Sequence, residues 1–138
     1  MLVTTKYLES QNASLPSLVL QVTQLVDSYM LWIGVSEGSP DDAQITVMRG
    51  RLSKDWACAM PPKAPSLVGP ATSFFRSSTS DVALSMAQRL AKRFKKQMFL
   101  SVDVPHSFLS MGNGQELLLE AERGIVVTLK EMEGAQTK

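Results

Sequence analysis

Hydrophobic positions recur with two different periods between Ser78 and Val104, and the change of period predicts a helix followed directly by a strand. Up to Phe94 the apolar residues recur three or four positions apart, which places one apolar stripe along an α-helix. From Met98 to Val104 every second residue is apolar, as in a strand, and Pro105 ends that pattern. The helical stripe comprises Val82, Ala83, Met86, Ala87, Leu90, Ala91 and Phe94.

Two further strands are predicted in the first third of the chain. The run from Leu18 to Val26 begins with alternating apolar and polar residues, which is typical of a strand with one covered face. The run from Tyr29 to Val35 is apolar at nearly every position, as expected for a central strand that is buried on both faces. Asp27-Ser28 separates the two runs, so we expect a tight turn between antiparallel neighbours.

Weaker patterns complete the predicted sheet. Leu2 to Leu8 predicts an edge strand, Trp56 to Met60 a further strand, and Leu117 to Ala121 a strand that follows the turn signal Asn113-Gly114. The segment from Ile125 onward has strand propensity and also a helical stripe, and we favour a short C-terminal helix. Together the patterns predict an α+β fold, an antiparallel sheet of about six strands with one long and one short helix packed on it.

Length and composition predict one globular domain over residues 1–138. A chain of this length with 44% hydrophobic and 20% charged residues can bury one core. The net charge of +1 provides no overall field that would attract nucleic acid or a membrane surface. Glu37 to Lys54 begins with turn-forming residues and has no clear period, so we predict a flexible insertion within the single domain.

We expect the protein in the cytoplasm, and in the nucleus as well. No apolar run reaches the length of a transmembrane helix, and the N-terminus lacks the basic start and apolar core of a signal peptide. The single cysteine, Cys58, excludes an internal disulfide and fits a reducing compartment.

The residues that could take part in catalysis or metal binding form no catalytic pattern. His106 is the only histidine, which argues against a metal site, and no P-loop arrangement follows Gly112-Asn113-Gly114. Cys58 lies in an apolar run without a flanking cation that would favour the thiolate. We therefore predict no enzymatic activity, no metal and no cofactor. The alternative is a small-ligand-binding or enzymatic domain with a pocket near Cys58 and His106.

Two groups of residues are candidates for contact with another protein. Basic residues gather at the end of the predicted helix, where they are by default a solvated face near the negative end of the helix dipole; the sharper hypothesis is an electrostatic dock for an acidic partner. The predicted strands also have more apolar surface than two helices would cover, so some of it should remain exposed for a partner. The basic cluster comprises Arg89, Lys92, Arg93, Lys95 and Lys96, and the candidates for core or dimer interface are Leu18, Leu20, Val22, Tyr29, Leu31, Met98 and Leu100.

Three blocks in order resemble the proteasome assembly chaperone 4 family: DSYMLWIGV from Asp27, WACAM from Trp56 and SDVALSMAQRLAKRFKKQMFLSVDV from Ser80. In that family an aspartate-serine turn leads into an aromatic-rich LWVG-type strand. Later a helix that reads LAQRLA plus basic residues is followed at once by a strand of the form K-Q-hydrophobic-F-hydrophobic-S. The matching positions here are Leu31 to Gly34, Met86 to Lys92 and Lys96 to Ser101.

The resemblance implies a small domain with an antiparallel sheet, helices on one face and a role as a noncatalytic chaperone. It implies a heterodimer with a related chaperone of the assembly chaperone 3 type. That heterodimer promotes assembly of the α-subunit ring of the 20S proteasome by binding α subunits, especially α5. This sequence departs from the family in the stretch Glu37 to Lys54 and in a proline-rich approach to the helix, so contacts assigned to those two loops stay open.

Overall fold

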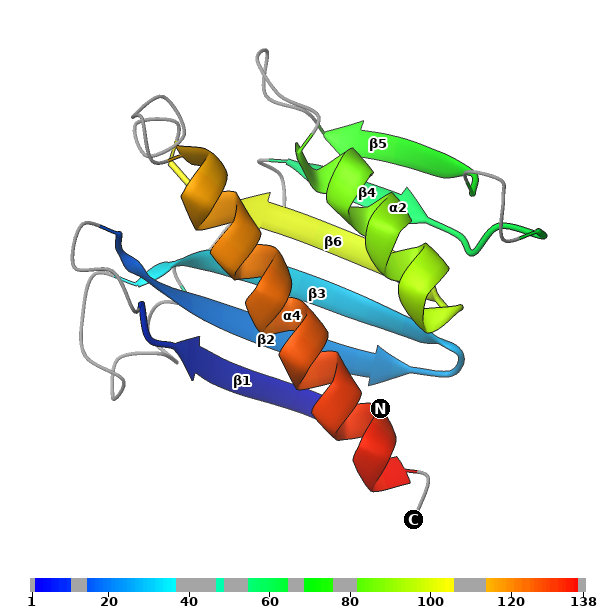
Figure 1. The fold of residues 1–138 in the computed structure, drawn as a ribbon, viewed down its shortest axis with the longest axis horizontal. Coiled ribbons are helices and arrows are strands. Elements are labelled where there is room, and N and C mark those ends of the chain that lie inside the picture. Colours follow the sequence, from blue (N-terminus) through cyan, green and yellow to red (C-terminus); the bar gives the residue numbers. More distant parts are fainter. Residues whose placement is uncertain are drawn as a thin grey trace.

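The computed structural model describes residues 2–10, 15–36, 47–48, 55–64, 69–75, 82–105 and 114–136. In these ranges six strands form one sheet with two helices beside it (Figure 1). The predicted insertion, Glu37 to Lys54, lies outside the described residues apart from Val47 and Met48. The strands are β1 (Leu2–Leu8), β2 (Ser17–Leu25), β3 (Ser28–Ser36), β4 (Trp56–Ala59), β5 (Ala71–Phe75) and β6 (Gln97–Asp103), and the helices are α2 (Val82–Phe94) and α4 (Gly114–Gln136).

The strand order is β1-β2-β3-β6-β4-β5, and every neighbouring pair is antiparallel except β3 and β6. The predicted α+β fold with six strands is confirmed, but the sheet is mixed rather than purely antiparallel. The parallel pair arises because the chain reaches β6 through the helix α2, and a helical crossover can return the chain to run in the same direction as an earlier strand. None of the helices in the described ranges has an apolar stretch long enough to cross a membrane.

Both helices lie on the same face of the sheet, and the core lies between them and the strands (Figure 1). Alternate strand residues face the helices, so one row of side chains crosses four strands in register. All members of this row are fully buried. The row comprises Val22 of β2, Leu31 of β3, Leu100 of β6 and Ala57 of β4.

Helix α2 agrees with the sequence pattern, and its beginning is held by a residue from another element. Its buried residues are Ala83, Met86, Ala87, Leu90 and Ala91, which belong to the predicted apolar stripe. The backbone N–H of Ala83 donates to the carboxylate of Asp55, at an N–O distance of 3.3 Å. Asp55 is buried just before β4 and fills the role of a capping acid at the positive end of the helix dipole.

Helix α4 corrects two predictions. Leu117 to Ala121 is not a strand but part of α4, and the C-terminal helix is the longer of the two, with 23 residues against 13. Leu117, Ala121, Ile125 and Leu129 are spaced four apart and all are buried, so one continuous stripe holds the helix on the sheet. Read alone, the first five residues of that stripe are too short a window to distinguish a helix from a strand.

Candidate functional site

The seven apolar residues predicted as core or interface all lie in the core. Leu18, Leu20, Val22, Tyr29, Leu31, Met98 and Leu100 are each at most 2% exposed. The expectation that some of them remain exposed is therefore wrong. The helical layer covers more of the sheet than the sequence predicted, because α4 is long rather than short.

The opposite face of the sheet is covered by neither α2 nor α4, and it carries large apolar side chains. Its central row runs from Trp32 on β3 through Ser101 on β6 to Trp56 on β4. The next row places Phe99 of β6 beside Cys58 of β4. We call this surface the helix-free face, because neither α2 nor α4 packs on it. Its centre is buried within the chain, with Val19, Trp32 and Ser101 at 0%, 6% and 0% exposed.

Four aromatic residues form what we call the aromatic band of the helix-free face: Trp32, Trp56, Phe74 and Phe99. The ring of Phe74 contacts Trp56 edge-on at a centroid distance of 5.0 Å and stacks on Phe99 at 6.4 Å. Phe74 remains 46% exposed. Aromatic residues with this combination of packing and exposure are enriched in protein interfaces.

Two polar groups in the aromatic band are buried. Among the described residues, the indole N–H groups of Trp32 and Trp56 find no hydrogen-bond acceptor. Such groups are uncommon in native cores, because a buried donor without an acceptor costs about 1–3 kcal/mol.

The structure divides the basic cluster into paired and unpaired residues. Arg89 donates to Glu122 of α4, with N–O distances of 2.9 Å from Nε and 2.6 Å from Nη2. Lys96 lies 3.2 Å from a carboxylate oxygen of Glu133 and 5.0 Å from the ring centroid of Tyr29. Among the described residues, no ion pair engages the other three members, Lys92, Arg93 and Lys95, all of which are exposed.

The pKa of Lys96 is raised above its ordinary value of 10.5. Partial burial opposes the charged form, but the hydrogen bonds with Glu133 and with the hydroxyl of Tyr29 favour the charged form more strongly. Lys96 is thus a positively charged tie between the end of α2, strand β3 and the end of α4.

Comparison with known proteins assigns the chain to a family. The family described as "Proteasome assembly chaperone 4" matches residues 17–104, which run from β2 through β6. The chain belongs to the proteasome assembly chaperone 4 family. The matched range contains the whole aromatic band and the basic cluster, whereas β1 and α4 lie outside it.

The fold is also that of a solved assembly chaperone. The chain is similar to one in the crystal structure of a novel chaperone complex for yeast 20S proteasome assembly, with a TM-score of 0.57 and 18% sequence identity. The similarity covers 95% of this chain and 98% of that chain, so β1 and α4 belong to the shared fold. Among curated proteins, no match was found.

In this member of the proteasome assembly chaperone 4 family, the described residues include only one of the two side chains of the alternative hypothesis. Cys58 is half-buried on the helix-free face, where the side-chain amide of Gln97 donates to its Sγ at 3.2 Å. His106 lies outside the described residues. Within the described ranges, no group of three histidine, cysteine, aspartate or glutamate side chains is placed to hold a metal ion.

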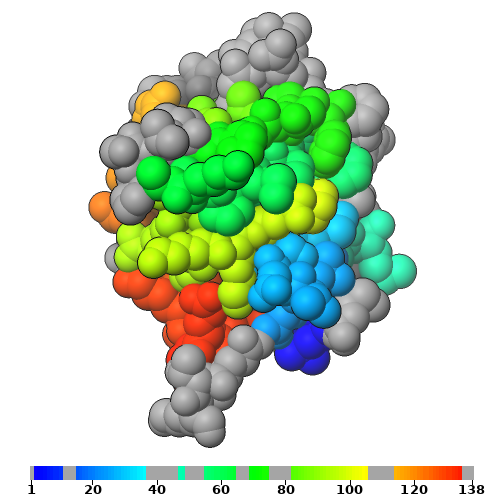
Figure 2. Space-filling model, turned by 90° about the vertical axis from the view of Figure 1, so that its right-hand side faces the viewer, coloured from blue at the N-terminus to red at the C-terminus, as the bar shows by residue number. Residues whose placement is uncertain are grey.

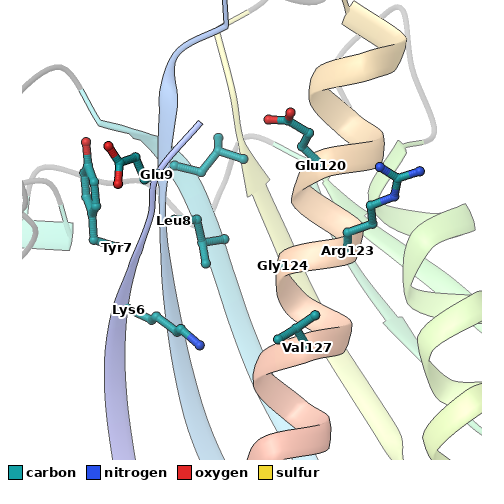
Figure 3. A pocket seen from close by; sticks show the side chains of 9 residues that line it. Lys6, Tyr7, Leu8, Glu9, Glu120, Arg123, Gly124 and Val127 are labelled. Atoms are coloured by element: carbon teal, nitrogen blue, oxygen red, sulfur yellow. The ribbon is translucent and has the colours of Figure 1, made fainter. Parts of the chain in front are cut away.

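A hollow of about 380 Å³ lies where β1 meets α4. Figure 3 shows Lys6, Leu8 and Val127 between the strand and the helix, while Arg123 points away from β1. A Cβ atom on Gly124 would lie 2.5 Å from a methyl group of Leu8, so glycine at this position allows the close approach of the two elements. Lys6 completes this joint with an ion pair of 3.1 Å to Glu131, and the residues that line the hollow include no serine, threonine, cysteine or histidine.

Proposed function

We propose that the chain is a noncatalytic chaperone of 20S proteasome assembly, which forms a heterodimer with a related small chaperone of the assembly chaperone 3 type. The heterodimer binds α subunits, α5 among them, while the α-ring forms. Family membership and the shared fold with a chain of a yeast 20S assembly chaperone complex support this proposal. We expect the heterodimer to bind α subunits in the cytoplasm and the nucleus.

The aromatic band is the observation that carries the proposal. A small related chaperone would bring a sheet of the same kind, and two sheets pack face to face at a separation of about 10 Å. The exposed ring of Phe74 would then fill the centre of the interface, where aromatic anchors contribute most of the binding energy.

Three of the five residues of the basic cluster support the proposed contact with an α subunit. Arg89 and Lys96 are engaged within the chain, which leaves Lys92, Arg93 and Lys95 to meet an acidic patch. Complementary charges of this kind raise the association rate and set the orientation of the partner. Such a chaperone favours the correct arrangement of subunits by binding it, without nucleotide.

The first test uses Phe74→Asp with a matched control. Phe74 is 46% exposed on the helix-free face and Leu119 is 49% exposed on α4, which packs on the other face. Tagged chains carrying Phe74→Asp or Leu119→Asp are purified from cells, and the bound proteins are identified by intact-complex mass spectrometry. We expect Phe74→Asp to lose the small chaperone at least tenfold, because a charge would be buried in the interface, and Leu119→Asp to retain it.

Two results would contradict the proposal in different ways. Equal retention of the small chaperone by both variants would remove the helix-free face from the interface. If the unaltered chain captured neither a small chaperone nor any proteasome subunit, the proposed function itself would be wrong. As a check on the alternative function, His106→Ala should leave partner capture unchanged, whereas an enzyme that used this histidine would lose its activity.

A further inference from the structure

Two turns meet at one end of the molecule, the right-hand end in Figure 1. One turn joins β2 to β3 at Asp27, and the other joins α2 to β6 at Lys95. Both residues have left-handed backbone conformations, with φ of 52° and 56°. The backbone N–H of Gln97 donates to the carbonyl of Asp27 at 3.3 Å, so the two turns are held together.

Apolar side chains are exposed at this end. Val26 is 92% exposed and Leu2 is 58% exposed, and both line a hollow of about 360 Å³ together with Leu25 and Gln24. We call Leu2, Leu25 and Val26 the apolar tip. Residues in a hairpin turn are usually polar, and neighbouring exposed apolar residues that line one hollow are typical of a protein-binding site.

The end of α2, which carries the unpaired part of the basic cluster, lies beside the β2–β3 hairpin. Figure 2 looks directly at this end, with the hairpin in light blue next to the end of α2 in yellow-green. Lys92, Arg93 and Lys95 are exposed. The tie formed by Lys96 with Tyr29 and Glu133 fixes the same region, so the surface is preorganised for binding.

We infer that the apolar tip and the exposed cations Lys92, Arg93 and Lys95 form one docking surface for an acidic protein segment that carries an apolar side chain. The hollow beside Val26 would take the apolar side chain, and the cations would face the acidic groups. This inference rests on the proposed function and identifies the surface as the one that contacts an α subunit.

The apolar side chains at this end favour a protein segment over a single-stranded nucleic acid. Among the described residues, no exposed aromatic side chain accompanies the cations, as it would in a surface that binds single-stranded nucleic acid.

The test compares Val26→Asp with Val127→Asp, the same substitution at an exposed position of α4. Each purified chain, in complex with its small chaperone, is titrated with recombinant α5 subunit at two salt concentrations. We expect Val26→Asp to weaken α5 binding at least tenfold and Val127→Asp to change it less than twofold, with the small chaperone retained by both. Lys95→Glu should weaken α5 binding and reduce its salt dependence.

Three results would overturn the inference, and they differ in what else they affect. Unchanged α5 binding by Val26→Asp would overturn the inference and leave the proposed function intact. If the unaltered heterodimer failed to bind α5 or any other α subunit, the inference and the proposed α-subunit contact would fall together. Binding of the unaltered chain to phosphatidylserine vesicles that Val26→Asp abolishes, with α5 binding intact, would reassign the tip to a membrane contact.

Discussion

Gly34 determines the position of the largest side chain on the helix-free face. A Cβ atom at this position would lie 2.5 Å from the indole ring of Trp32, a distance at which the ring must shift. The ring is rigid and nearly buried, so it has little room to move. Glycine in β3 is therefore a packing requirement of the aromatic band.

We predict that Gly34→Ala lowers the free energy of unfolding by about 1–3 kcal/mol, the usual cost of overpacking. The matched control is Gly134→Ala in α4, where an added Cβ meets nothing within 4 Å. That substitution should stabilise the chain by roughly 0.5–1 kcal/mol, since alanine has the higher helix propensity. Urea denaturation of both variants measures the two changes, and equal effects of the same sign would contradict this account.

Single residues show where the sequence was informative and where it was not. The stripe of α2 was predictable because each member lies within about one turn of the next and all share one period. Asp55 was not, because it caps α2 from a position 28 residues before Ala83. Phe74 likewise became part of a site only through its contacts with Trp56 and Phe99, which lie on other strands.

The element that differs most from its prediction is α4, and its last turns are tied to the rest of the molecule by Lys96. Lys96→Met removes the ion pair with Glu133 and the cation–π contact with Tyr29. We expect a loss of about 1 kcal/mol in the free energy of unfolding at neutral pH. Lys92→Met is the control, because the described structure gives Lys92 no ion pair, and it should change stability little.

The same tie has a defined pH dependence. The pKa of Lys96 is higher in the folded chain than its ordinary value of 10.5, so folding favours the protonated form. The stabilisation is fully present below that ordinary value and is lost as the pH rises through the raised pKa. The difference in stability between the unaltered chain and Lys96→Met should therefore be constant from pH 6 to pH 9 and shrink only in strong alkali.

For the molecule as a whole, the fold class and the family could be predicted from local patterns, whereas the interaction surfaces could not. Hydrophobic periods identify which residues are apolar, but the strand order decides which apolar residues share a face. The sequence left residues such as Leu20 and Leu31 as candidates for core or interface, and the helices bury them. Trp32 and Phe99 of the aromatic band lie on the alternate positions of β3 and β6, and the band is completed from β4 and β5.

A partner that packs on the exposed ring of Phe74 should stabilise the folded chain. A partner that binds only the folded chain adds RT ln(1 + [L]/Kd) to the free energy of unfolding, about 2.7 kcal/mol at one hundred times Kd. We predict that the melting temperature of the purified chain rises steadily with the concentration of the small chaperone. Phe74→Asp should abolish most of that rise, and a melting temperature independent of the partner would contradict the proposed heterodimer.

The parallel pairing of β3 with β6 also sets the order in which this chain can fold. The strands β1, β2 and β3 form a meander of neighbours in sequence, so they can pair as soon as they emerge during synthesis. The central seam must wait for β6, which is made only after β4, β5 and α2. Pairing of β3 with β6 closes a loop that contains the whole intervening segment, which costs conformational entropy. We expect this pairing to limit the folding rate. Until β6 pairs with it, β3 is an open strand edge. At that stage the chaperone chain is itself most prone to pairing with a wrong strand.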